Sequence, residues 1–114
     1  MKYVCLVYAD EQDLHDLPDS PPDAECKAFS ERQAEAGRMV GGQALQPVAT
    51  ATTVRVRAGD VSITDGPFAE TREQLAGFYL IEARDLNEAI RFASQVPPAR
   101  VGSVEIRPVR ELEP

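Results

Sequence analysis

The chain has little of what specialised proteins are rich in. Its 114 residues include no tryptophan, one histidine and two cysteines. Two cysteines are too few for a disulfide-stapled scaffold, so we expect a reduced, cytoplasmic location. No apolar run approaches the ~20 residues of a membrane-spanning helix, and the stretch Tyr3 to Ala9 is too short for a signal peptide. We therefore expect residues 1–114 to form one ordinary globular domain.

Basic residues are also scarce. Lysine and arginine number 12 against 19 aspartates and glutamates, which gives a formal net charge of −7. Residues 10–25 contain seven acids and no lysine or arginine, so this segment alone accounts for the excess. An acidic chain repels phosphate backbones, and no stacking aromatics accompany the alternating Arg55 and Arg57. We expect neither a nucleic-acid partner nor a membrane partner.

Motifs that hold cofactors or metals are missing. The sequence has no G-x-G-x-x-G and no P-loop, so no phosphate cradle is predicted. His15, Cys5 and Cys26 cannot complete a four-ligand zinc site, and both cysteines fit buried small apolar residues. The acidic segment lacks EF-hand spacing and is expected to be a flexible, solvated loop. We expect no cofactor and no metal.

Apolar patterning predicts five strands. Residues 2–9 and 78–81 are apolar on both faces, which is typical of central strands covered on both sides. Residues 52–57 and 61–64 alternate around a turn at 58–60, which predicts a β-hairpin with one buried face. Residues 103–109 form the closing strand, and a short segment at 43–45 is broken by Pro47.

Two helices are predicted between these strands. The first extends from about residue 21 to 39, with Ser20 as its cap, Asp23 completing a capping box, and Gly41-Gly42 ending it. Its expected inward residues are Cys26, Phe29, Ala36 and Val40. Asp85 caps the second helix, which ends before Pro97-Pro98. Residues 69–75 have room for one or two further helical turns.

The order of elements predicts the fold class. Strand, helix, strands, strand, helix, strand is the ferredoxin-like βαββαβ arrangement, an α+β fold, here with an added β-hairpin. Two helices cover only one face of such a sheet. Since the central strands are apolar on both sides, a second copy packed sheet to sheet is the simplest cover, and we predict a two-fold homodimer.

A sequence motif near the middle of the chain is similar to that of a known family. Residues 65–71, DGPFAET, followed by EQL at 73–75 and GFY at 77–79, resemble the signature of the DGPF branch of the YCII-related proteins. KYV at 2–4, TTVR at 52–55 and GSVEIRPV at 102–109 resemble the same family. The resemblance implies a dimeric α+β barrel in a family of small, mostly uncharacterised bacterial proteins.

The resemblance also bears on function. Some family genes lie beside genes for extracytoplasmic-function sigma factors, which implies a regulatory link. A relative in the wider family resembles a dehydrochlorinase of chlorinated hydroxyquinones, with a proposed His–Asp pair. The corresponding positions fall near Asp23 or Ala24 and near Val96, so this chain does not keep that pair.

Four segments offer candidate site residues. Asp65, at a strand end, is either a general base or the first residue of an Asx turn before Gly66. Glu70 and Thr71 follow closely and are candidates for substrate binding, although Thr71 also suits a cap. Tyr8 could present its hydroxyl to a ligand, and Arg100 could bind a carboxylate or phosphate through two hydrogen bonds.

Two classes of function fit these residues. The first is a cofactor-independent enzyme or binding protein for a small organic metabolite, with Asp65 as acid/base and Tyr8 and Arg100 orienting the substrate. The second is a non-enzymatic regulatory protein whose acidic segment or sheet edge contacts a partner such as a sigma factor. The sequence favours the first only by analogy with the folds of other α+β barrels.

Overall fold

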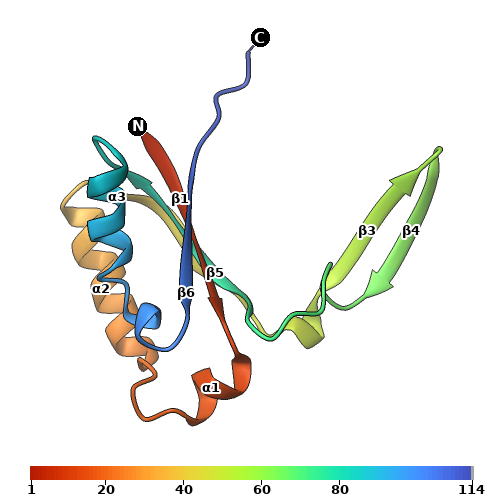
Figure 1. Cartoon of the computed structure of the whole chain (residues 1–114), viewed down its shortest axis with the longest axis horizontal. Coiled ribbons are helices and arrows are strands. Elements are labelled where there is room, and N and C mark those ends of the chain that lie inside the picture. Colours follow the sequence, from red (N-terminus) through yellow and green to blue (C-terminus); the bar gives the residue numbers. More distant parts are fainter. Residues whose placement is uncertain (114) are drawn as a thin grey trace.

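Strand β1 (Lys2–Ala9) lies in the middle of a four-stranded antiparallel sheet in the computed structural model, which describes residues 1–113. The strand order is β2-β5-β1-β6, with β2 at Met39–Ala44, β5 at Gln74–Glu82 and β6 at Ser103–Pro108. Helices α2 (Asp23–Glu35) and α3 (Leu86–Ala93) cover one face of this sheet (Figure 1). The predicted α+β class, with both helices on one face, is confirmed.

The core lies between the sheet and the two helices. Alternate residues of β1 point into it, and Cys5 is completely buried. The ring centroid of Tyr79 from β5 lies 6.0 Å from that of Phe29 of α2 and 5.7 Å from that of Phe92 of α3. Edge-on aromatic contacts at these distances add to the stabilisation from burial alone.

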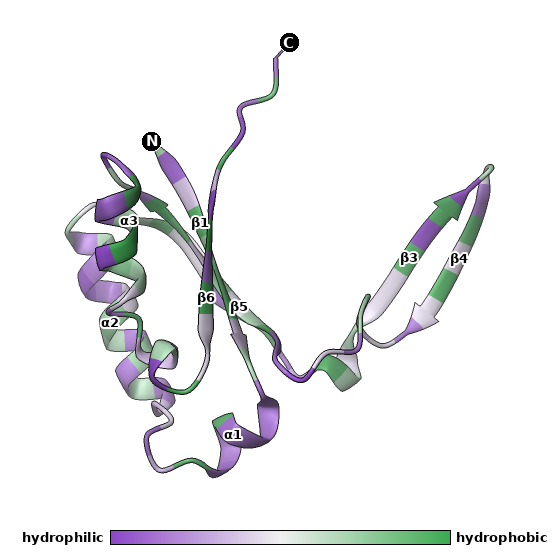
Figure 2. Cartoon of the chain, viewed as in Figure 1, coloured by the Kyte–Doolittle hydropathy of each residue, from purple (hydrophilic) through white to green (hydrophobic). Residues whose placement is uncertain are grey.

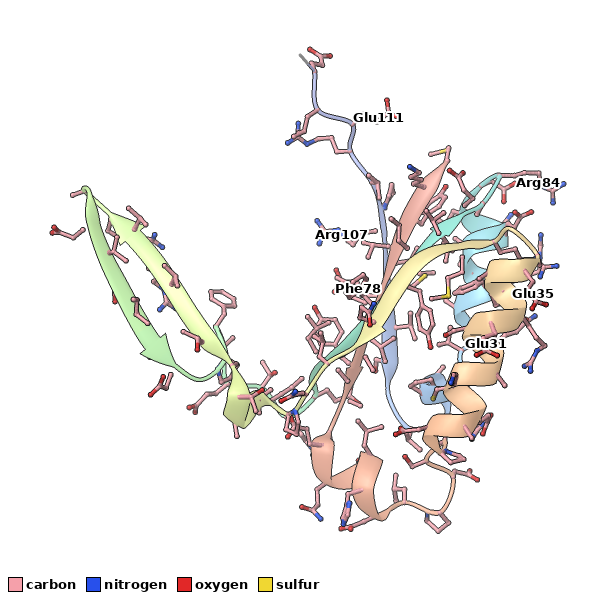
Figure 3. All side chains as sticks on the ribbon, turned by 180° about the vertical axis from the view of Figure 1, so that it is seen from behind. Glu31, Glu35, Phe78, Arg84, Arg107 and Glu111 are labelled. Carbon is pink, nitrogen blue, oxygen red and sulfur yellow. The ribbon has the colours of Figure 1, made fainter. Side chains whose placement is uncertain are left out.

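The opposite face of the sheet has an apolar centre. The register places Val4 opposite Leu80 and Leu6 opposite Phe78, and all four side chains are partly buried by their neighbours in the sheet. Arg107 lies opposite Val4 on β6 and points away from the helices (Figure 3). We call this surface the open face, because no helix within residues 1–113 packs against it. Its members are Val4, Leu6, Tyr8, Phe78 and Leu80, with Glu105 and Arg107 at one edge.

The predicted hairpin is present and projects from the sheet. Strands β3 (Thr52–Arg57) and β4 (Asp60–Asp65) form a separate two-stranded sheet, which we call the arm. Ala58 and Gly59 make the turn between them with positive φ angles of 50° and 83°. Figure 2 shows apolar and polar residues alternating along both strands. The expected burial of one side of the hairpin does not occur within this chain.

Helix α2 is shorter than the sequence predicts. It begins at Asp23 with Pro22 at the cap position and ends at Glu35, before Gly37 with a φ of 76°. The predicted cap by Ser20 is therefore wrong, since its hydroxyl donates instead to the carbonyl of Leu14 at 2.6 Å. The predicted end at residue 39 is wrong because a left-handed glycine stops the helix earlier.

The inward face of α2 also differs from expectation. Phe29 is buried as predicted, but Ala36 is exposed beyond the helix end and Val40 lies on β2 with 52% of its surface exposed. Gln33 is buried instead, one turn after Phe29. In α3 the predicted cap is confirmed, because the Asp85 carboxylate accepts a hydrogen bond from the Glu88 amide at 2.9 Å.

The acidic segment is partly ordered into a short helix. Helix α1 (Glu11–Asp16) begins after Asp10, whose carboxylate accepts hydrogen bonds from the amides of Gln12 and Asp13. The expectation of a flexible loop is wrong here, because an aspartate cap and acids in the first turn favour a helix. Residues 69–75 contain no helical turn. None of the helices within residues 1–113 has the length and apolar character that crossing a lipid bilayer requires.

Candidate functional site

A cavity of about 590 Å³ lies on the helix side of the sheet, beside the edge strand β2. Helix α2 forms one wall, β2 and β5 form another, and the segment from α1 to Pro21 closes one end. The lining is mostly apolar. Its members include Val7, Leu14, Pro21, Cys26, Met39, Ala44, Leu45, Ala76, Phe78, Tyr79 and Pro98.

Few polar side chains line this cavity, and most of them come from α2. Among residues 1–113, Asp23 is the one carboxylate in the lining and Lys27 the one amine, and they are four residues apart on the same side of the helix. Ser30, one turn further along, adds a hydroxyl. The outer side of α2 carries other acids, and Figure 3 shows Glu31 and Glu35 pointing away from the sheet.

Burial raises the pKa of two side chains of the lining, Tyr79 and Cys26. It raises the pKa of the Tyr79 phenol to about 12, with smaller contributions from the neighbouring Cys26 and Cys5 thiols. Burial also raises the pKa of the Cys26 thiol, and the carboxylates of Glu25 and Asp23 raise it further. At neutral pH the cavity therefore presents a phenol and a thiol, and Cys26 lacks the thiolate needed for nucleophilic attack.

Two glycines let β2 approach β5 along the cavity wall. A Cβ atom on Gly42 would lie 2.7 Å from the carbonyl oxygen of Phe78, and one on Gly77 would lie 2.8 Å from that of Gln43. Such distances are far below ordinary contact, so both positions require glycine. The register between β2 and β5 also shifts between Met39 and Gly41. This irregular edge forms part of the cavity wall.

Arg100 fixes the start of α2 against the loop before β6. Its guanidinium donates two hydrogen bonds to Glu25, at 2.6 and 3.0 Å, and a third to the carbonyl of Asp19. The bond from Arg100 lowers the pKa of the Glu25 carboxyl. The two guanidinium hydrogen bonds that were predicted to bind a ligand are thus made to the Glu25 carboxylate of the chain itself. Arg100 positions the helix that lines the cavity, and its ligand role stays a prediction.

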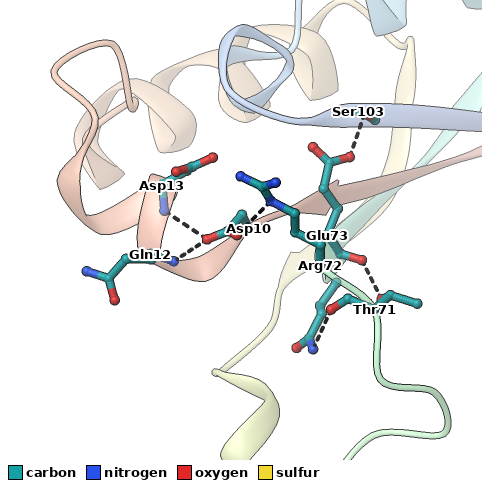
Figure 4. A network of polar contacts seen from close by, with 8 residues as sticks. Asp10, Gln12, Asp13, Thr71, Arg72, Glu73 and Ser103 are labelled. Atoms are coloured by element: carbon teal, nitrogen blue, oxygen red, sulfur yellow. Dashed lines mark hydrogen bonds and ion pairs between the residues drawn. The ribbon is translucent and has the colours of Figure 1, made fainter.

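A polar cluster joins the segment after the DGPF motif to the ends of β1 and β6 (Figure 4). Arg72 lies 3.7 Å from Asp10, and Ser103 donates a hydrogen bond to Glu73 at 2.7 Å. The Thr71 hydroxyl donates to the carbonyl of Glu73 at 2.6 Å. Thr71 therefore stabilises the turn into β5, and it lies outside the cavity lining.

The structure does not bring the other predicted site residues together. Asp65 ends β4 at the base of the arm, where its side chain is exposed and paired in register with Thr52. Glu70 is exposed in the following loop, and Tyr8 lies on the open face opposite Ser103. None of the three is among the residues that line the cavity. Their catalytic and binding roles stay predictions.

A second, smaller cavity of about 340 Å³ lies between the end of α2 and α3. Its side chains are mostly charged or amide-bearing, and several are already paired: Arg38 donates to Gln33 at 3.2 Å, and Glu88 contacts Arg84 at 2.9 Å. A ligand would have to displace these contacts. The larger cavity is the better candidate for a binding site.

Sequence reasoning missed most of the residues of the larger cavity. Cys26 was expected to be a buried apolar residue, and it is half-buried in the lining. Ser30 lies within a predicted helix and carries no motif, and Tyr79 lies in the GFY segment of the family signature but was not predicted as a site residue. One signal was available: Asp23 and Lys27 are four residues apart and so share a helix face.

Comparison with known proteins places the chain in a family. An uncharacterised protein of Rhizobium meliloti (strain 1021) is 41% identical over 92 residues, which are 79% of this chain and 74% of the relative. A solved structure, the 5-chloro-2-hydroxyhydroquinone dehydrochlorinase of Burkholderia phenoliruptrix AC1100 in complex with 2,5-dihydroxybenzoquinone, shares the fold. It superposes with a TM-score of 0.57 and 13% identity over 96% of this chain and 94% of the other. The family model of the YCII-related domain matches residues 1–113, and the chain therefore belongs to that family.

Proposed function

We propose that the protein binds a small organic molecule in the cavity between α2 and the β2–β5 edge of the sheet. The observation that carries the proposal is the cavity itself, whose volume of about 590 Å³ lies within the usual range for small-molecule sites. Its walls combine apolar side chains with a few polar groups from one helix, which is the composition such sites usually have.

The lining favours a ligand with an apolar body and one or two hydroxyl or carbonyl groups. The Tyr79 phenol and the Ser30 hydroxyl can each donate or accept a hydrogen bond. Asp23 can accept a proton from a ligand hydroxyl, and Lys27 can stabilise the resulting anion. If a reaction takes place, the geometry supports proton transfer at Asp23 better than nucleophilic attack by Cys26.

The comparisons support small-molecule binding in general terms. The dehydrochlorinase from Burkholderia was solved with 2,5-dihydroxybenzoquinone, a small organic molecule, and it shares this fold. At 13% identity the likeness extends to the fold alone. Catalysis by Asp65, predicted from the sequence, is a separate proposal, and Asp65→Asn tests it without altering the cavity.

Thermal unfolding of the natural chain with a panel of compounds tests the proposal. The panel contains phenol, catechol, hydroquinone, benzoate and cyclohexanol at millimolar concentration. A ligand at 100 times its Kd raises the free energy of unfolding by about 2.7 kcal/mol, so at least one compound should raise the Tm by several degrees.

Variants locate the effect. Ser30→Phe fills the cavity and should abolish the rise in Tm, whereas Ala34→Phe on the exposed side of the same helix should keep it. Asp23→Asn should weaken binding of the hydroxylated compounds, with Glu31→Gln as the matched control. A rise that survives Ser30→Phe, or no rise with any compound, would contradict the proposal and favour the interaction-protein alternative.

A further inference from the structure

The lining of the larger cavity becomes more polar from its deep end to its opening. Tyr79 lies at the deep end with only 8% of its surface exposed, and Cys26 and Ser30 are half-buried. Asp23 and Lys27 are exposed members of the same lining, so they lie where the cavity opens to solvent. A bound molecule therefore meets a shielded, mostly apolar interior at one end and two charged side chains at the other.

The two charged side chains at the opening are free to bind a ligand. They leave the same side of α2 four residues apart, with Cβ atoms roughly 5–6 Å from each other. Asp23 and Lys27 nevertheless form no ion pair with each other or with any other residue of the part of the chain that the structure describes. Glu25, between them in the sequence, is instead bound by Arg100 at 2.6 Å. The opening thus offers one anion and one cation.

The deep end of the cavity holds a polar group among apolar walls. Within residues 1–113 the Tyr79 hydroxyl has no hydrogen-bond partner, and burial raises the pKa of this phenol to about 12. Val7, Leu14 and Phe78 are among the apolar residues of the lining. A long aliphatic or aromatic chain fits such an interior because burying apolar surface is favourable. A charged group does not fit there, because it would lose its hydration.

Charge decides which head group fits the opening. A carboxylate alone would pair with Lys27 but would be repelled by Asp23, and an ammonium alone would pair with Asp23 but would be repelled by Lys27. A head group that carries both charges pairs with both side chains and has no net charge. The segment that closes one end of the cavity lies within residues 10–25, which hold seven acids and no lysine or arginine. Its negative field disfavours a ligand that is only an anion.

We propose that the cavity between α2 and the β2–β5 edge takes an amino acid with a long apolar or aromatic side chain. The ammonium of the amino acid pairs with Asp23 and its carboxylate pairs with Lys27, both at the opening. Its side chain enters the apolar interior toward Tyr79. This inference rests on the proposed function, because it names the class of molecule that the same cavity binds.

Amide NMR titrations of the natural chain at low salt compare four molecules that share a phenyl ring. L-Phenylalanine carries both charges, 3-phenylpropanoate only the carboxylate, 2-phenylethylamine only the ammonium, and 3-phenylpropan-1-ol neither. L-Phenylalanine should bind about fivefold more tightly than either singly charged molecule, which is the factor that one favourable exposed ion pair contributes. This advantage should shrink at high salt because the charges at the opening are exposed and therefore screened. L-Alanine, which lacks the apolar chain, should bind at least about tenfold more weakly than L-phenylalanine.

Variants assign the two contacts through effects of opposite sign. Asp23→Asn should weaken binding of L-phenylalanine about threefold and tighten binding of 3-phenylpropanoate, because an attraction is lost in the first case and a repulsion in the second. Lys27→Gln should likewise weaken binding of L-phenylalanine but tighten that of 2-phenylethylamine. Glu31→Gln, on the outer side of α2 (Figure 3), and Lys2→Gln, at the start of β1, are the matched controls and should change neither.

The outcomes separate this inference from the proposed function. If 3-phenylpropan-1-ol binds in the cavity while L-phenylalanine binds no more tightly than the singly charged molecules, the inference is overturned and the proposed function stands. The inference is also overturned if L-alanine binds as tightly as L-phenylalanine, or if Asp23→Asn and Lys27→Gln leave the order of affinities unchanged. If none of these molecules and none of the phenolic panel shifts the amides of the cavity, both proposals fail.

Discussion

Alkaline pH should destabilise the protein through two buried acids of the core. Burial raises the pKa of the Cys5 thiol from 9.0 to about 11 and that of the Tyr79 phenol from 10.0 to about 12. Between pH 9 and 11 the folded chain keeps the Cys5 proton that the unfolded chain has lost, and between pH 10 and 12 it keeps the Tyr79 proton. Their contribution to stability is therefore complete below pH 9 and is lost progressively as the pH rises to 12.

The size of the loss follows from the shifts. Each pKa unit corresponds to 1.36 kcal/mol, so a shift of two units gives at most about 2.7 kcal/mol per group. Solvent near the ring edge of Tyr79 screens part of this, and we expect about 1–2 kcal/mol from each group. Against a total stability of about 5–15 kcal/mol, the combined effect is readily measured.

Urea unfolding followed by circular dichroism at pH 8, 10 and 11.5, at one protein concentration, measures the loss. Tyr79→Phe should remove the part that develops between pH 10 and 12, and Cys5→Ala the part between pH 9 and 11. Each variant serves as the control for the other, because only the slope against pH is compared. If the free energy of unfolding of Tyr79→Phe falls with pH above pH 10 as steeply as that of the natural chain, the phenol is not shielded as the structure implies.

Three further predictions concern the edge strand β2, the core and the cap of α1. Gly42→Ala should destabilise the chain by several degrees in Tm, because its Cβ would meet Phe78, whereas Gly41→Ala on the same strand meets nothing within 4 Å and should change little. Ile81→Ala should cost about 2–5 kcal/mol of unfolding free energy in a urea titration, against less than about 1 kcal/mol for Ile90→Ala, since Ile81 is fully buried and Ile90 is half-exposed. Asp10→Ala removes the cap of α1 and should cost about 1 kcal/mol, measured by urea unfolding, with exposed Asp16→Ala as the control.

Much of the fold could be predicted because local signals agreed with tertiary packing. The apolar run at residues 2–9 and the alternation at 52–64 gave the central strand and the arm. The predicted cap at Asp85 is confirmed, because its carboxylate accepts a hydrogen bond from the Glu88 amide in the first turn of α3. Fold class followed from the order of these elements alone.

Helix ends and the acidic segment were harder to predict. Ser20 looked like a cap, but tertiary contact directs its hydroxyl to the Leu14 carbonyl. Gly37 ends α2 because of its backbone conformation, and the sequence also offered Gly41-Gly42 as a stop. Asp10 caps α1, yet seven acids without a base indicated a solvated loop.

The candidate cavity could not be predicted from motifs. It forms where α1, α2 and β2, which follow one another in the sequence, meet β5 and Pro98 from much later in the chain. The prominent DGPF residues instead form the base of the arm and the turn into β5. A motif shows where a local structure recurs, whereas a cavity depends on how several elements pack.

Amide NMR of the natural, labelled chain, titrated with the same panel of compounds, tests the central claim most directly. The account predicts that at least one compound shifts a compact set of amides on three elements, including Ser30 of α2, Gln43 of β2 and Tyr79 of β5. Shifts confined to the arm, the open face or the smaller cavity between the end of α2 and α3 would contradict it, as would an unchanged spectrum with every compound at millimolar concentration.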